Sequence, residues 1–362
     1  MMLKWIWLVI TIIIALLNKF FSYVLGKISF NPSQTQTETV VYLKENIPIL
    51  QKGQQLKVLT YNVQFMAGKN YVFFYDLPDW DGPDKRPSTA DINHTITEVA
   101  RIIKAEDPDV ILLQEVDDGA TKTDYKDQLA CLLKLLPACY CCHTSTFYWQ
   151  APFVPHPGIM GAVGQKLSII SKYKINQATR YQLPNVFTDP LVQVFRPKRA
   201  MLEATLAVSD GSEFIILTTH PEVASYGAEI KEAEICMIKH HLEKLNQANK
   251  PWLIGGDFNL LLPTQLETLP ENLAFEFRPQ TELMPLLKHF QAIPDIAQTI
   301  KEEMPKWYTM FPNNPQIKAP DRTTDYIFFS NHLQLIKGYV RQHDTLAISD
   351  HLPLIAEVEY KQ

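Results

Sequence analysis

Short apolar runs recur along the chain, and polar residues follow or end each of them. Glycine, proline and charged residues bound the runs, which is typical of strands buried on both faces. A further run, MLEATLAV at 201–208, alternates between apolar and polar positions as a half-buried strand does. The clearest buried runs are LTYNV (59–63), LLQEV (112–116), ILTTH (216–220), LIGGDFN (253–259), TDYIFFS (324–330) and LPLIAEVEY (352–360).

Apolar residues at helical spacing predict helices between these strands. The first helix should cover about 92–105, because Pro108 prevents it from continuing much further. The residues that mark the three helices are Ile96, Val99 and Ile103, then Leu129, Leu132, Leu133 and Leu136, then Ile235, Ile238, Leu242 and Leu245.

Two segments show neither the strand periodicity nor the helix periodicity, and they are rich in aromatic residues and proline. They cover residues 64–93 and 147–164. Long irregular segments inside a domain more often contribute to function than merely connect secondary-structure elements. We therefore expect both segments to flank a binding site.

Residues 1–30 form a hydrophobic N-terminal segment. The uninterrupted run Trp5–Leu17 would be only about 20 Å long as a helix, whereas the run 5–25 approaches the bilayer core of about 30 Å. We interpret 5–25 as a membrane anchor, with no charge bias that decides its orientation. A signal peptide cleaved near Gly26, with export of the protein, is the alternative, and a buried helix is the third interpretation. Polar residues then predict a linker leading into the domain over 31–54, and residues 55–362 a single domain.

The composition of the 362-residue chain is that of a globular protein, with 46% hydrophobic residues and a net charge of -5. This charge provides no general attraction to nucleic acid, although a local basic patch would suffice. Five cysteines include the cluster CYCCH at 139–143. Zinc would require a second ligand pair, for which only Cys131 and Cys236 remain, so we favour small buried residues on a strand.

The polar residues at the strand ends are predicted to converge. Buried Asp, Glu and His side chains are costly without partners, and strand ends gather at one rim of a sheet. The candidates are Asn62, Glu115, His220, Asp257, Asn259, Asp350 and His351.

The ordered motifs LTYNV, LLQEV, TTH, GGDFN, TTDYIFF and SDHLP resemble those of the endonuclease/exonuclease/phosphatase superfamily, which includes neutral sphingomyelinases and inositol-polyphosphate 5-phosphatases. The resemblance covers residues 56–360. It implies a DNase I-like, four-layer α/β sandwich, in which two mixed β-sheets pack face to face with helices on the outside. It also implies hydrolysis of a phosphoester with Mg²⁺, or alternatively Mn²⁺, which makes 55–362 a catalytic domain.

The resemblance also assigns residues to the metal and to the base. Glu115 is the expected principal metal ligand, with Asn62 and Asp350 nearby, and oxygen ligands are those that Mg²⁺ prefers. His351 is the expected general base. Asp325 would hold its imidazole in the useful tautomer.

The remaining assignments concern the substrate. Asp257 and Asn259 would position the attacking water and the phosphoryl oxygens, and His220 would donate to a non-bridging oxygen. Pro221 follows His220 where the family commonly has leucine. Arg199 could either meet phosphate or pair with an acidic neighbour.

The substrate itself is predicted less directly. QKLSIIS (165–171) departs from the Gly-Asn-Ala type sequence of the family, so substrate contacts there are open. Aromatic residues in 64–93 and 147–164, together with the N-terminal segment, favour a lipid headgroup at a membrane. A nuclease of the same fold is the alternative. It ranks second because the basic residues are too scattered to follow a nucleic-acid backbone. A non-catalytic binding module is the third class, and we expect a monomer.

Overall fold

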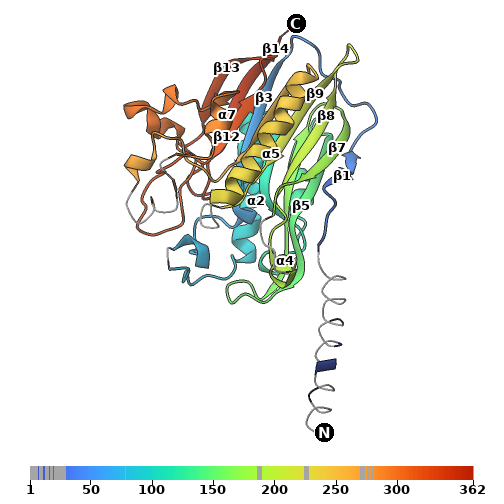
Figure 1. The fold of residues 1–362 in the computed structure, drawn as a ribbon. Helices are drawn as coiled ribbons and strands as arrows, with labels where there is room; N and C mark the ends of the chain where they lie inside the picture. Colours follow the sequence, from blue (N-terminus) through green and yellow to red (C-terminus); the bar gives the residue numbers. More distant parts are fainter. Residues whose placement is uncertain are drawn as a thin grey trace.

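Two β-sheets lie face to face in the computed structural model, which describes residues 30–361 except 78, 186–189, 224–227, 270–273, 275, 276 and 279. Trp7, Thr11, Ile12, Leu16 and Lys19 are also described. Helices α2 and α5 lie on opposite sides of the pair of sheets (Figure 1). The four-layer α/β sandwich predicted from the sequence is therefore confirmed.

The first sheet has seven strands in the order β13-β14-β3-β4-β6-β5-β2. It is mixed, since β3 and β4 run parallel and the other neighbours antiparallel. Its strands are β13 (Leu333–Val340), β14 (Leu354–Tyr360), β3 (Gln55–Asn62), β4 (Val110–Asp117), β6 (Gly161–Ser171), β5 (Cys142–Val154) and β2 (Val40–Tyr42).

The second sheet has seven strands in the order β1-β7-β8-β9-β10-β12-β11. Here β9 and β10 form the parallel pair. Its strands are β1 (Thr35–Glu38), β7 (Ile175–Gln182), β8 (Ala200–Ala207), β9 (Glu213–Thr219), β10 (Trp252–Asp257), β12 (Asp325–Phe329) and β11 (Gln291–Ile293).

The helices of the described residues are few, and most of them are short. They are α2 (Thr89–Glu106), α3 (Gln128–Leu133), α4 (Pro190–Phe195), α5 (Ala228–Gln247) and α7 (Met284–Leu287). Single 3-10 turns or short 3-10 helices are η1 (Gln64–Met66), η2 (Phe74–Asp76), η3 (Thr121–Thr123), η5 (Leu266–Thr268), η6 (Ala297–Thr299) and η7 (Lys301–Trp307). Ser88 is the N-cap of helix α2, and its side chain accepts a hydrogen bond from the Asp91 N–H.

The strands are buried on both faces, as their apolar runs predict. In β3, Val58 belongs to the core between the sheets, whereas Leu59 packs with α2 on the outside. In β10, Leu253 faces the same central core, and Ile254 packs toward α5. Period-two alternation thus supplies two apolar faces from one continuous apolar run.

Two sequence-based expectations of irregular structure need correction. Most of residues 147–164 belongs to a hairpin of β5 and β6, and buried residues alternate with more exposed ones along much of β5. The aromatic residues had masked this alternation. Segment 31–54 contributes the edge strands β1 and β2, whose polar residues resemble a linker because one face of an edge strand meets solvent.

The membrane anchor predicted over residues 5–25 is also corrected. None of the helices in the described part of the chain has both the length and the apolar content to span a bilayer. The uninterrupted run ends before Lys19, so it would be only about 20 Å long as a helix. Apart from the five N-terminal residues named above, this segment and the alternative cleavage site near Gly26 lie outside the described residues.

Candidate active site

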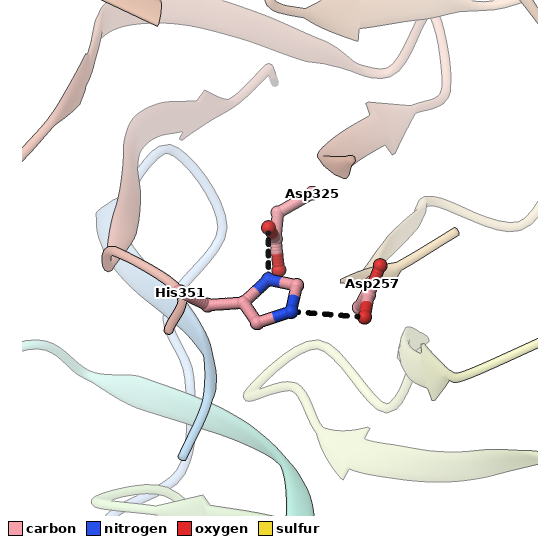
Figure 2. A group of neighbouring side chains, drawn as sticks. All are labelled: Asp257, Asp325 and His351. Atoms are coloured by element: carbon pink, nitrogen blue, oxygen red, sulfur yellow. Dashed lines mark hydrogen bonds and ion pairs between the residues drawn. The ribbon is translucent and has the colours of Figure 1, made fainter. Parts of the chain in front are cut away.

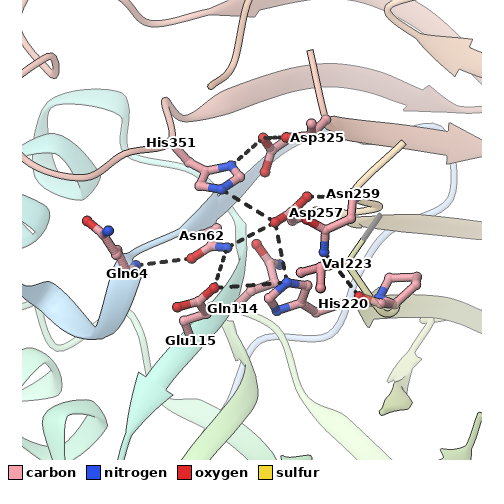
Figure 3. A network of polar contacts seen from close by, with 12 residues as sticks. Asn62, Gln64, Gln114, Glu115, His220, Val223, Asp257, Asn259, Asp325 and His351 are labelled. Carbon is pink, nitrogen blue, oxygen red and sulfur yellow. Dashed lines mark hydrogen bonds and ion pairs between the residues drawn. The ribbon is translucent and has the colours of Figure 1, made fainter. Parts of the chain in front are cut away.

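The ends of three strands, two from one sheet and one from the other, converge on one group of polar side chains (Figure 3). Asn62 ends β3, Asp257 ends β10, and Glu115 lies near the end of β4. Asn62 Nδ2 donates to Glu115 Oε1 at 3.0 Å and to Asp257 Oδ2 at 3.1 Å. The contact with Glu115 joins two neighbouring strands of the first sheet, whereas the contact with Asp257 crosses to the second sheet, so the packing of the sandwich assembles the site.

Glu115 reaches this group through a β-bulge. The register between β4 and β6 shifts between Leu113 and Val116, and Glu115 has a φ of 58°. A bulge redirects a side chain that would otherwise follow the alternation of the strand, and a left-handed residue other than glycine costs conformational energy. The bulge places the Glu115 carboxylate at the rim, where its side chain is 21% exposed.

His351 lies between two carboxylates (Figure 2). Its Nδ1 is 2.8 Å from Asp325 Oδ2, and its Nε2 is 3.4 Å from Asp257 Oδ2. Asp257 and Asp325 are direct partners in the antiparallel β10–β12 pair, so the sheet register sets the spacing of the carboxylates. Burial alone would lower the pKa of His351, but Asp325, Asp257 and Asp350 outweigh it and raise the pKa well above its ordinary value.

Asp257 contacts several residues of the site, namely Asn62, His220, His351 and Asn259. Burial raises its pKa to about 7, against the opposing effect of the positive charge on His351. His220 Nε2 lies 3.4 Å from Asp257 Oδ2 and 3.9 Å from Glu115 Oε1. Burial, followed by the positive charges of Arg199 and His351, lowers the pKa of His220 well below its ordinary value. A neutral imidazole therefore faces the two carboxylates.

Asn259 is held by its neighbours, with a left-handed φ of 53°. Its backbone N–H donates to Asp257 Oδ1 at 2.9 Å, and its side-chain Nδ2 donates to the Pro221 carbonyl at 3.1 Å. The Asn259 amide thus connects β10 to the residue after His220. The contact of Asn259 with phosphoryl oxygens stays a prediction.

Asp350 is buried next to the end of β3. Ser349 Oγ donates to the Asn62 carbonyl at 2.9 Å and lies 3.2 Å from Asp350 Oδ1. Burial raises the pKa of Asp350, His351 opposes this rise, and the negative charge of Glu115 adds to it. The carboxyl groups of Asp350 and Glu115 therefore share one electrostatic environment.

Arg199 does not face this group of carboxylates. Its Nη2 donates to Glu222 Oε1 at 3.0 Å, and the Arg199 and Glu222 side chains are only 10% and 7% exposed. The structure therefore favours the acidic-neighbour alternative over a phosphate contact for Arg199, because its charge is already paired.

Residues 59–351 match the Endonuclease/Exonuclease/phosphatase family. The chain belongs to this family. A comparison with curated proteins found no match. Among solved structures, an endonuclease/exonuclease/phosphatase from Beutenbergia cavernae is 22% identical and has a TM-score of 0.59, over 85% of this chain and 72% of that one.

Two further solved structures share the fold of the family. The human Nocturnin catalytic domain with bound sulfate is 18% identical with a TM-score of 0.54, over 90% of this chain and 97% of that one. TDP2 from D. rerio, complexed with a single-strand DNA product, is 13% identical with a TM-score of 0.51, over 84% and 99% of the two chains. Membership and fold together make this chain a hydrolase-fold protein of a family that acts on phosphoesters.

Family members generally use divalent metals, and the donor atoms here fit such an ion. Asn62 Nδ2 contacts both Glu115 Oε1 and Asp257 Oδ2, and burial followed by the charge of Glu115 raises the pKa of Asp350. A hard cation with oxygen ligands would offset this concentration of buried negative charge. Asp257, Asp325 and His351 also lie close enough together to hold an ion, but both nitrogens of His351 already face carboxylates.

Some residues of the site carried no separate signal in the sequence. Gln114 Nε2 bridges the sheets, donating to Thr218 Oγ1 at 2.8 Å and to Thr60 Oγ1 at 3.2 Å. The ring of Tyr148 lies edge-on to that of His220, with centroids 5.5 Å apart. Gln114 could have been inferred from its place in the LLQEV motif. Tyr148 lies in the aromatic segment 147–164 that was expected to flank the site, but its contact with His220 could not be inferred, because β5 and β9 belong to different sheets.

Proposed function

We propose that this protein is a Mg²⁺-dependent phosphodiesterase or phosphatase that uses water as the nucleophile. One observation carries the proposal. The Asp325–His351–Asp257 chain adjoins the Asn62–Glu115 pair, so proton-accepting groups and a metal-competent carboxylate surround one point.

Each residue has a separate role in the proposed hydrolysis. In in-line attack, the oxygen of water bonds to phosphorus while the bond to the leaving alcohol breaks. The Asp257–His351 pair accepts the proton of water, because a group whose pKa lies near neutrality serves best as a general base. Asp325 keeps the proton of His351 on Nδ1 and stabilises the imidazolium. His220, which is neutral, donates through Nε2 to a non-bridging oxygen.

Glu115 and Asp350 would hold the divalent ion, which when bound would neutralise the phosphate charge and favour ionisation of water. For Asn62 we propose a positioning role in place of the ligand role expected from the sequence. Its Oδ1 accepts the Gln64 N–H at 3.0 Å, and its Nδ2 faces both Glu115 and Asp257. Asn62 therefore positions the carboxylates in our proposal.

Hydrolysis of bis-(p-nitrophenyl) phosphate with Mg²⁺ tests the proposal. Wild-type protein should release p-nitrophenol, and Glu115→Ala or His351→Ala should abolish the release. Glu357→Ala is the matched control, because this partly exposed glutamate lies on β14 and contacts Lys57 at 3.8 Å. Release by wild type that equals release by the Glu115→Ala/His351→Ala double variant would favour a non-catalytic binding module.

A lipid headgroup is the substrate class that we favour. The rings of Phe74 and His156 are 4.7 Å apart, so the 64–93 segment meets the tip of the β5–β6 hairpin. Tyr75, Trp80 and Phe153 on these two segments are 40%, 47% and 48% exposed. Although the Tyr75 side chain is 40% exposed as a whole, its hydroxyl end is desolvated and faces the site, because burial and then the charges of Asp76, Glu115 and Asp350 raise its pKa. Exposed aromatic residues next to the site suit an amphipathic substrate.

A nuclease is the second candidate, supported by the similarity to TDP2 in complex with single-strand DNA product. Purified protein should release headgroups from sphingomyelin or phosphatidylcholine vesicles faster than it cleaves single-stranded or plasmid DNA. DNA cleavage with inert vesicles would reverse this order.

A further inference from the structure

A buried ion pair, Arg199–Glu222, lies next to the backbone of His220. Arg199 immediately precedes β8, and Glu222 follows β9 by three residues. Arg199 Nη2 and Glu222 Oε1 are 3.0 Å apart. Because a buried charge is costly, such a pair requires further partners.

Arg199 contacts His220 both directly and through a ring. Its Nη1 lies 3.5 Å from the His220 carbonyl, at the limit of a hydrogen bond. Its guanidinium lies over the Tyr148 ring at 5.2 Å, and Tyr148 in turn lies edge-on to the imidazole of His220. The hydroxyl of Tyr148 is fixed on its other side by Gln165, at 3.1 Å.

Glu222 fixes the chain on the other side of His220. The Glu222 N–H donates to Glu234 Oε2 on α5 at 2.9 Å, and the Val223 N–H lies 3.2 Å from Glu222 Oε1. The Pro221 carbonyl is already held by Asn259. In every residue from His220 to Val223, a backbone N–H or carbonyl thus contacts a side chain. For Pro221 this group is the carbonyl, because proline has no backbone N–H.

We propose that the Arg199–Glu222 pair is a positioning device that holds the His220 imidazole in line with Asp257 and Glu115. This inference rests on the proposed hydrolase function. Arg199 and Glu222 touch no reacting atom in this scheme and act through His220. A side chain displaced by about 1 Å from its productive position can cost on the order of 10²-fold in rate.

Kinetics of four variants on bis-(p-nitrophenyl) phosphate test the proposal. Arg199→Met should lower kcat by about 10- to 100-fold with little change in KM. Arg199→Lys keeps the charge without the planar fork, so its loss should be intermediate. The double variant Arg199→Met/Glu222→Gln removes both buried charges and should fold while remaining slow. Arg341→Met is the matched control, because Arg341 pairs with Glu106 at 2.8 Å and both side chains are 10% exposed.

Non-additivity separates positioning from a general loss of structure. In a His220→Ala background, Arg199→Met should lower kcat by no more than about twofold, because residues that act as a unit are not additive. A full further loss in that background, or an equal loss in Arg341→Met, would overturn the proposal. So would a normal kcat in Arg199→Met.

A second readout does not depend on turnover. The His220 ring signal in a histidine NMR spectrum, assigned by its disappearance in His220→Ala, should shift or broaden in Arg199→Met and stay unchanged in Arg341→Met. If wild-type protein hydrolyses nothing, the proposed function fails, and the NMR comparison still decides the positioning role. An unchanged signal would refute that role.

Discussion

Replacing Asp325 with asparagine removes one charge and changes the shape of the side chain very little. Asp325 Oδ2 lies 2.8 Å from His351 Nδ1, and both residues are buried. Unit charges about 4 Å apart interact by about 4 kcal/mol at an effective dielectric constant of 20, so the imidazolium loses up to about that much stabilisation. Since 1.36 kcal/mol corresponds to a tenfold change in rate, kcat should fall by about 10³-fold, within the usual range for a general base.

The assay is the rate of p-nitrophenol release by Asp325→Asn under saturating substrate and Mg²⁺. Thermal unfolding should show that the variant folds. Asp109→Asn is the matched control, since Asp109 accepts a hydrogen bond from the Lys57 N–H at 2.9 Å just before β4. A loss smaller than tenfold for Asp325→Asn, or an equal loss for Asp109→Asn, would refute the assignment of Asp325 to His351.

Three further predictions concern the ion, the pH dependence and the core. Glu115→Gln should raise the Mg²⁺ concentration needed for half-maximal rate by at least about tenfold, whereas an unchanged Mg²⁺ titration would exclude Glu115 as a ligand. Burial raises the pKa of Glu234 to about 8, so its neutral form stabilises the fold at acidic pH and this contribution is lost as pH rises through about 8. Glu234→Gln should therefore lessen the fall in Tm between acidic and alkaline pH, and an unaltered Tm profile would contradict this. Leu253→Ala, at a fully buried position between the sheets, should lower the free energy of unfolding by about 2–5 kcal/mol in urea titration, and a loss below about 1 kcal/mol would show a core that collapses around the vacancy.

The strands could be predicted because their apolar runs depend on local sequence, and the candidate site residues could be named because ordered motifs along the chain carry them. The apolar run before Asp257 has the length of a buried strand and stops at a polar residue. Both the strand and the polar residue at its end can therefore be predicted from it. Asp325 and His351 could be assigned because ordered motifs carry them. The register between β10 and β12 then brings Asp257 and Asp325 together.

The directions of individual side chains could not be predicted in the same way. Nothing in the sequence signals the bulge at Glu115, which depends on the pairing of β4 with β6. The partner of Arg199 depends on how the end of β9 packs against α5, so the sequence left two alternatives open. The two polar edge strands were missed because an edge strand needs little apolar surface.

The most direct test of the central claim follows the attacking oxygen. The protein is incubated with a phosphodiester and Mg²⁺ in water labelled with heavy oxygen, and the phosphate-containing product is analysed by mass spectrometry. Water attack on phosphorus at the site of Glu115, Asp257 and His351 predicts one labelled oxygen per cleaved bond in that product, and no product from His351→Ala. Label found only in the alcohol, or equal labelling by His351→Ala, would contradict the account.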